Sequence, residues 1–151
     1  MPVQEIDVHQ RGGFWLPSMP WMRNLNFRVP GNTTLYIGPA GSICTDQEEI
    51  AQAVIPRPAG IRALLLRTIG EEGQPGDGDL LIRIRNGGQD TPLLVVVPRG
   101  STPPHTYAQR TQRALFELGD LFSIALENQA STDSVLLGSL GMDLEVVEGT
   151  W

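Results

Sequence analysis

The stretch DLLIRIRNGGQDTPLLVVVP, from Asp79 to Pro98, decides the fold class. Its first seven residues alternate so that one face of an extended strand is apolar and the other carries arginines. The pair Asn86-Gly87 follows, and it is typical of a type I′ turn because both central residues of that turn need a positive φ. A second apolar run begins at Pro92. The stretch therefore predicts an antiparallel β-hairpin.

Further short strands are predicted on both sides of this hairpin. They are the segments 33–37, 61–69, 121–126 and 140–146, each bounded by glycine, proline or polar residues. The segment 46–55 fits a short helix opened by a capping box or a strand, and we favour a strand for its second half. The segment 106–116 fits an edge strand or a short helix. About eight strands separated by turns predict an all-β, jelly-roll-like antiparallel sandwich.

The composition agrees with one domain of this class. A chain of 151 residues can remove roughly 68–70% of its unfolded surface from water, which is enough for one core. The 17 glycines and 12 prolines favour many turns over long helices. The net charge is −6, and the 11 basic residues, all arginine, form no cluster, which argues against direct contact with nucleic acid. No stretch approaches the ~20 apolar residues that a membrane-spanning helix needs, so no membrane partner is expected.

Residues 1–32 differ from the rest of the chain. Five of the nine aromatic residues fall within the first 36 positions, between prolines and glycines and without a helical or strand period. Such a segment is too aromatic for a disordered tail. It either folds back over its own domain or, as we favour, forms an extended arm that docks on a neighbouring subunit. The predicted domains are thus an arm, 1–32, and a β-sandwich, 33–151, and the predicted partner-binding residues of the arm are Phe14, Trp15, Trp21 and Phe27.

The residues that most often carry chemistry are scarce. His9 and His105 are the only histidines, and they form no His-x-His pair of the kind that a metal-dependent jelly-roll enzyme needs. The acidic loop 71–79 lacks the alternating ligands of a dedicated calcium loop. Cys44 is the single cysteine and has no recognisable base or orienting partner in the sequence. We therefore expect a protein that is not an enzyme and has no cofactor or metal.

Four sequence landmarks occur in a fixed order. They are PAGIRAL at 58–64, DLLIRIRNGG at 79–88, LGDLFSI at 118–124 and GMDLEV at 141–146. The series resembles a jelly-roll module of tailed-bacteriophage capsid decoration (cement) proteins, head fibres and tail fibres. The resemblance covers about residues 54–147 and leaves the aromatic arm outside. The chain departs from the usual module in the bulky Leu118 before the Gly-Asp turn and in the long segment 106–116.

The resemblance implies a structural protein of the virion. It would lie on the outer surface of the phage head after synthesis in the host bacterial cytoplasm, bind the major capsid protein and copies of itself, often as a homotrimer, and stabilise the particle. The alternative that it implies is a receptor- or glycan-binding knob of a head or tail fibre. The candidate sugar platforms for that alternative are Trp15, Trp21, Tyr107 and Trp151, although burial at a subunit contact is the better explanation for most of these rings.

Overall fold

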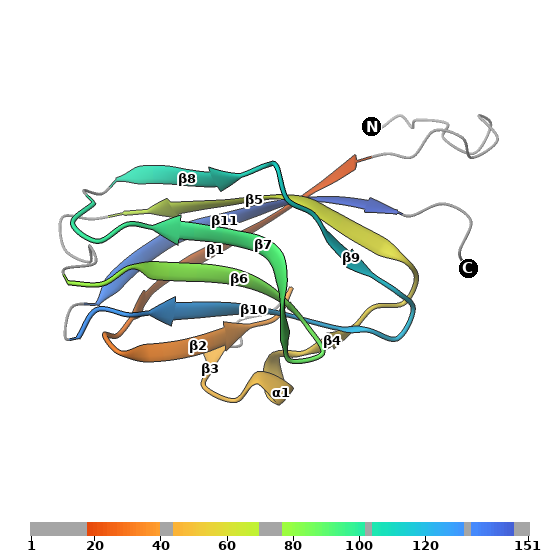
Figure 1. Cartoon of the computed structure of the whole chain (residues 1–151), viewed down its shortest axis with the longest axis horizontal. Helices are drawn as coiled ribbons and strands as arrows, with labels where there is room; N and C mark the ends of the chain where they lie inside the picture. Colours follow the sequence, from red (N-terminus) through yellow and green to blue (C-terminus); the bar gives the residue numbers. More distant parts are fainter. Residues whose placement is uncertain (1–17, 40–43, 70–76, 102–103, 132–133, 147–151) are drawn as a thin grey trace.

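The computed structural model describes residues 18–39, 44–69, 77–101, 104–131 and 134–146. Within these ranges the chain forms eleven strands and one short helix. The strands make two antiparallel sheets that pack face to face, and Figure 1 shows them as an upper and a lower layer. The predicted all-β sandwich is therefore confirmed.

The first sheet has the strand order β1-β11-β5-β8, and β9 also pairs with β5. Every pairing in it is antiparallel. The segment 106–116, for which a strand and a helix were both open, contributes the two edge strands β8 and β9. The bounds are β1 (Ser18–Val29), β5 (Ala59–Thr68), β8 (His105–Gln109), β9 (Ala114–Phe116) and β11 (Val135–Val146).

The second sheet has the order β3-β2-β10-β6-β7, and β4 also pairs with β10. Apart from the hairpin of β6 and β7, which lies within the second sheet, successive long strands alternate between the sheets, and the first strand lies beside the last. This is the winding of a jelly roll. Eight strands are five residues or longer, as predicted, and three are shorter. The bounds are β2 (Thr33–Ile37), β3 (Cys44–Thr45), β4 (Ala53–Val54), β6 (Leu80–Asn86), β7 (Gln89–Val97) and β10 (Leu121–Asn128).

The hairpin of β6 and β7 is confirmed, but its turn lies one residue later than predicted. The central residues are Gly87 and Gly88, with φ of 60° and 82°, and Asn86 pairs with Gln89. Asn86 stays in β6, where its side-chain amide donates to Asp120 Oδ2 at 2.9 Å. Two consecutive glycines accept positive φ without a steric cost, so the turn forms at the glycine pair and Asn86 keeps its strand contacts.

The predicted boundary of the arm is wrong for residues 18–32. Ser18–Val29 form β1, which pairs with β11, so this part belongs to the sandwich. The strand was hidden in the sequence because a bulge between Asn24 and Phe27, with Asn26 at a φ of 54°, interrupts the two-residue period. Pro20 is tolerated because β1 is an edge strand. Residues 1–17 of the predicted arm lie outside the described residues.

The far end of β1 is tied to the second sheet by a buried amide. Asn128 is the last residue of β10 and is almost fully buried. Its Nδ2 donates to the carbonyl of Val29 at 2.9 Å, and its Oδ1 accepts from the backbone N–H of Ala130 at 3.0 Å. A buried amide needs such partners, and here they join the end of β1 to the end of β10.

The segment 46–55 contains both of the structures that were considered. Glu48–Ala51 form the helix α1. The second half of the segment contains the strand β4, as we favoured. The capping box does not form, because the helix starts at Glu48 with Gln47 as N-cap and no side-chain cap. The hydroxyl of Thr45 instead accepts a hydrogen bond from the backbone N–H of Gln47 at 3.0 Å.

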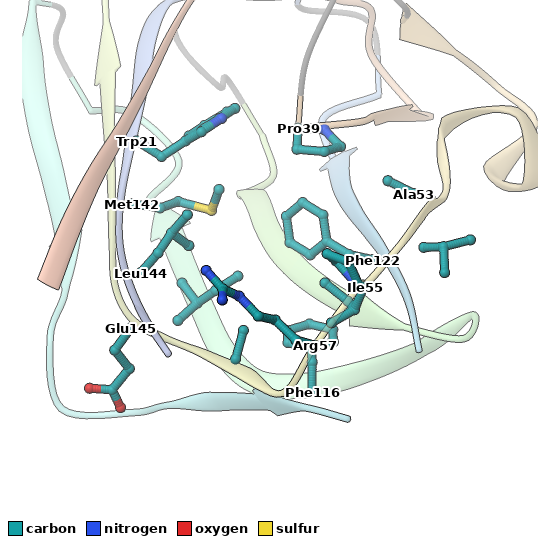
Figure 2. A pocket seen from close by; sticks show the side chains of 14 residues that line it. Trp21, Pro39, Ala53, Ile55, Arg57, Phe116, Phe122, Met142, Leu144 and Glu145 are labelled. Atoms are coloured by element: carbon teal, nitrogen blue, oxygen red, sulfur yellow. The ribbon is translucent and has the colours of Figure 1, made fainter. Parts of the chain in front are cut away.

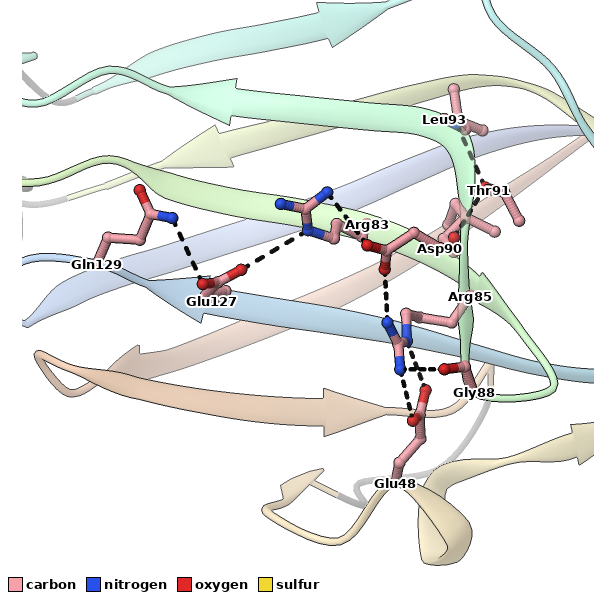
Figure 3. Close-up of polar contacts among 10 residues, drawn as sticks. Glu48, Arg83, Arg85, Gly88, Asp90, Thr91, Leu93, Glu127 and Gln129 are labelled. Atoms are coloured by element: carbon pink, nitrogen blue, oxygen red, sulfur yellow. Dashed lines mark hydrogen bonds and ion pairs between the residues drawn. The ribbon is translucent and has the colours of Figure 1, made fainter.

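An ion pair fixes α1 on the outer face of the second sheet (Figure 3). Arg85 donates to both carboxylate oxygens of Glu48, at 2.8 and 3.0 Å, and to Asp90 at 2.6 Å. The buried hydroxyl of Ser123 donates to the same carboxylate at 2.9 Å. The hydrogen bond from Arg85 is the main reason that the pKa of Glu48 lies below its usual value. A helix of four residues is unstable alone, so this carboxylate holds it in place.

We predict that E48Q destabilises the protein at neutral pH and changes its response to acid. Because the folded-state pKa of Glu48 is lowered, its contribution to stability is present above the ordinary value of 4.5 and is lost as the pH falls through the folded-state pKa. The free energy of unfolding at pH 7 should drop by about 1.5–3 kcal/mol, the range for hydrogen bonds to charged groups. Urea titrations from pH 7 to pH 3 should show a shallower acid loss in E48Q than in the wild type.

The matched control is E49Q, which neutralises an exposed carboxylate on the same helix. It should leave both the stability at pH 7 and the acid profile close to those of the wild type. An E48Q variant with the full acid loss of the wild type would contradict this role of Glu48.

Candidate functional site: an apolar cavity between the sheets

The structure places the four predicted partner-binding residues in two groups. Phe14 and Trp15 lie outside the described residues. Trp21 and Phe27 are half-buried in β1, and both side chains pack against the core of their own domain. The two residues differ in one respect: Trp21 also lines a cavity, and Phe27 does not. Of the four predicted residues, Trp21 is therefore the one that the described structure places at a candidate site.

The cavity has a volume of about 280 Å³ and opens between the two sheets (Figure 2). It lies at the end of the sandwich where β1 begins and β11 ends, since Trp21 of β1 and Leu144 of β11 both line it. Met142, directly opposite Trp21 in the strand register, supplies a third wall. Apart from Arg57 and Glu145, all the residues that line it are apolar.

The cavity exists because small residues lie where the chain crosses between the sheets. Residues 55–58 connect β4 of the second sheet to β5 of the first, and the strands on either side contribute Ala53 and Ala59 to the walls. Beside them the rings of Phe116 and Phe122 meet edge to face, with 5.6 Å between centroids. These two rings come from opposite sheets, so they close the deep side while the alanines leave space in front of it.

A hydrogen bond between the sheets lies next to the cavity. Arg23 follows Trp21 by two residues on β1, so its side chain points to the same face. Its guanidinium donates to the carbonyl of Gly38, just after β2, at 2.6 Å. Pro39, the next residue, lines the cavity. Arg23 therefore joins the two sheets beside the cavity and holds them at a fixed separation there.

The two charged lining residues stand at the edge of the cavity. The carboxylate of Glu145 points away from it in Figure 2, toward ion pairs with Arg113 at 3.3 Å and Arg62 at 3.6 Å. The side chain of Arg57, which is exposed, extends across the opening toward Leu144. The interior consequently offers apolar contact alone, and the chemistry that it suits is an uncharged apolar or aromatic group.

Exposed apolar side chains continue this surface beyond the cavity. Leu115 and Leu118, 61% and 66% exposed, border a neighbouring groove together with Phe116, whose ring also lines the cavity. Val54, 66% exposed, lies at the cavity itself. The same groove is also lined by the polar residues Asn86, Glu117 and Asp120, so the apolar residues alternate with polar ones. Single exposed apolar residues are ordinary on a soluble domain, but several of them beside an apolar cavity favour a site of interaction.

The other candidates of the sequence are separate from the cavity. In the part of the chain that the structure describes, no group of three or more His, Cys, Asp or Glu could hold a metal ion. Asp77 accepts from the backbone N–H and hydroxyl of Ser131, at 2.8 and 2.6 Å, and these bonds lower its pKa. Partial burial raises the pKa of the Cys44 thiol. The ring of His105 packs against Tyr107, with 4.6 Å between centroids.

Among the described helices none is long and apolar enough to cross a membrane. The sequence matches no protein-family model and no curated protein.

We predict that the cavity binds indole, a rigid apolar probe of the right size. An apolar cavity of about 150 Å³ holds one benzene, so 280 Å³ accommodates the larger indole. Titration with indole should shift the methyl NMR signal of Met142, which lines the cavity. The signal of Met22, which is 78% exposed and not among the lining residues, should not move.

The matched variants are A59L and A108L. A59L adds a larger side chain inside the cavity and should abolish the Met142 shift, whereas A108L makes the same change on the exposed surface of β8 and should leave it intact. Equal shifts in both variants would place the indole elsewhere.

Proposed function

We propose that this chain is a structural virion protein of a tailed bacteriophage that decorates the outside of the head and cements the shell. The observation that carries the proposal is the apolar cavity with its exposed apolar surroundings at the end of the sandwich where β1 begins. The aromatic pair Phe14-Trp15 precedes that strand in the sequence and is separated from it by Leu16 and Pro17. A pre-formed apolar surface beside an aromatic segment suits binding between protein subunits.

The four landmarks give the proposal its second support. The jelly-roll winding is the fold that the resemblance implies. Three of the landmark segments also supply cavity walls: 58–64 through Ala59 and Ile61, 118–124 through Phe122, and 141–146 through Met142 and Leu144. Three of the four landmarks thus contribute residues to the candidate site, and the assignment to a phage particle rests on that resemblance.

The geometry suggests how such a protein would stabilise a shell. In this proposal the sandwich is the part that decorates the shell, and the aromatic segment is its means of attachment to the major capsid protein or to other copies, including those of a homotrimer. Fully burying one Phe or Trp side chain contributes roughly 1.5–3 kcal/mol. A few such contacts for each copy, repeated over a shell, would resist its disassembly without any chemical reaction.

Removal of residues 1–17 tests the proposal. The deletion must stop before Ser18, because residues 18–29 form β1 and their loss would disrupt the first sheet. We expect the shortened protein to keep its circular dichroism spectrum and melting temperature, and its occupancy on preformed heads in co-sedimentation to fall at least tenfold. The double variant F14A/W15A should behave like the deletion.

The control variant is Q4A/Q10A, which changes two polar residues of the same segment and should bind heads like the wild type. Unchanged occupancy after the deletion would eliminate the arm as the means of attachment. Absence of the protein from purified particles, measured by mass spectrometry, would eliminate the virion function.

The alternative, a glycan-binding knob, is favoured by one observation on the other side of the molecule. Tyr107 and His105 form a pair of contacting rings on the edge strand β8. Part of the Tyr107 ring packs on the core, which leaves less of it for a sugar than a dedicated platform would offer. For this reason the cavity supports the better proposal.

Saccharide binding separates the alternative from the main proposal. A knob predicts a hit on a bacterial glycan array that Y107L abolishes, while leucine keeps the apolar contact with the core. Y36L, a change of the other tyrosine, should retain the signal. A decoration protein predicts no saccharide binding that depends on Tyr107.

A further inference from the structure

We propose that the apolar cavity is the receptor for the Phe14-Trp15 segment of a second copy of this chain. The inference rests on the proposed function, in which the aromatic segment binds another protein subunit, and it specifies which subunit that is. It assigns that contact to another copy, and not to the capsid protein. Each copy would then offer both a donor, its own Phe14-Trp15, and an acceptor, its own cavity.

The interior of the cavity matches an aromatic side chain in size and chemistry. Its walls combine the aromatic residues Trp21, Phe116 and Phe122 with the flexible thioether of Met142. Aromatic rings pack favourably against one another edge to face, and sulfur packs favourably against ring edges. At about 280 Å³ the space admits an indole ring but not a folded element such as a helix.

The donor segment has the charge pattern that such a cavity requires. Residues 12–22, GGFWLPSMPWM, contain no charged side chain, although charged residues stand on both sides at Arg11 and Arg23. An aromatic pair inside an uncharged stretch can enter an apolar cavity without burying an unpaired charge. The charged residues at its opening, Arg57 and Glu145, then remain outside the contact.

The position of β1 brings the donor close to the opening. Ser18, the first residue of β1, pairs with Glu145 at the edge of the cavity. Trp15 is three residues and Phe14 four residues before Ser18, so they lie within at most about 14 Å of it along an extended chain. The chain therefore enters the described domain at the end where the cavity opens, and two such ends placed together would bring each donor within reach of the other's cavity.

The sequence beside Ser18 favours a second copy over the same copy. To enter its own cavity, Trp15 would need a reversal of the chain within Leu16 and Pro17. A residue before proline avoids the helical region, so Leu16 favours an extended conformation. A turn with Pro17 at its second position would need Ser18 and Met19, which are already paired with β11. Gly12-Gly13 are the residues best suited to a reversal, but they precede the aromatic pair and cannot direct it back.

An exchange of this kind also sets the geometry of assembly. A contact of one donor with the acceptor of the next copy is heterologous, and such contacts close into rings or continue as open chains. The homotrimer expected from the resemblance would be a closed ring of three donors and three cavities.

Photo-crosslinking between isotopically distinct copies tests the inference. Full-length unlabelled chain carrying p-benzoylphenylalanine in place of Trp15 is refolded together with ¹⁵N-labelled wild-type chain, which lets the copies mix, and is then irradiated. We expect the probe to be joined to ¹⁵N-labelled peptides that contain cavity residues, in or beside β4, β5, β9 or β11. With equal amounts of both chains, about half of the cavity crosslinks should be to ¹⁵N-labelled copies.

Variants of the labelled copy connect the crosslinks with the cavity. A59L in the ¹⁵N-labelled chain should reduce them at least fivefold, whereas A108L, on the exposed surface of β8, should leave them unchanged. In sedimentation equilibrium, W15A should weaken self-association of the full chain at least tenfold. Melting curves of every variant identify any that fail to fold.

Three results would overturn the inference. Crosslinks confined to the chain that carries the probe would assign the segment to its own cavity. Crosslinks to other surfaces, or an equal effect of A59L and A108L, would remove the cavity as receptor. A small apolar molecule that occupies the cavity in native mass spectra and prevents crosslinking would assign it to a ligand. The proposed function fails separately, through absence from particles, because the crosslinking uses the purified protein alone.

Discussion

The pairing of the first strand with the last is the constraint on which the rest of the structure depends. β1 and β11 pair along most of their twelve-residue lengths, so the beginning and the end of the described domain lie side by side. This pairing covers what would otherwise be an exposed edge of β11 and sets Trp21 opposite Met142. The amide of Asn128 holds the far end of β1 against the second sheet. The cavity at the near end is a direct result of this arrangement.

The strand β6 could be predicted from the sequence because one of its faces is polar. In β6 the buried Leu80, Ile82 and Ile84 alternate with Arg83 and Arg85, and this period of two is unambiguous. β1 could not be predicted in the same way. Its bulge at Asn26 adds one residue to the strand, so the side chains on the two sides of the bulge follow different phases. A pattern search therefore sees no period across residues 18–29.

The site could be predicted only in part, for a different physical reason. Aromatic composition identified Trp21, but nothing in the sequence indicated that Ala53 and Ala59 leave a space in front of Phe116 and Phe122. A cavity is the volume that packed side chains fail to fill, and its walls here come from both sheets and from residues more than 100 positions apart. No local pattern can encode such a volume. The crossing at residues 55–58, rich in proline and flanked by small residues, was the available sequence signal.

The contact between Arg23 and Gly38 makes the cavity a pre-organised one. Because this hydrogen bond joins the sheets beside the opening, the aperture exists before anything enters it. An incoming side chain gives up its own freedom of rotation but does not have to separate the two sheets. The conformational cost of binding is thereby limited to the side chain that enters. Under this condition a small apolar contact can form rapidly and can select its binding group by size.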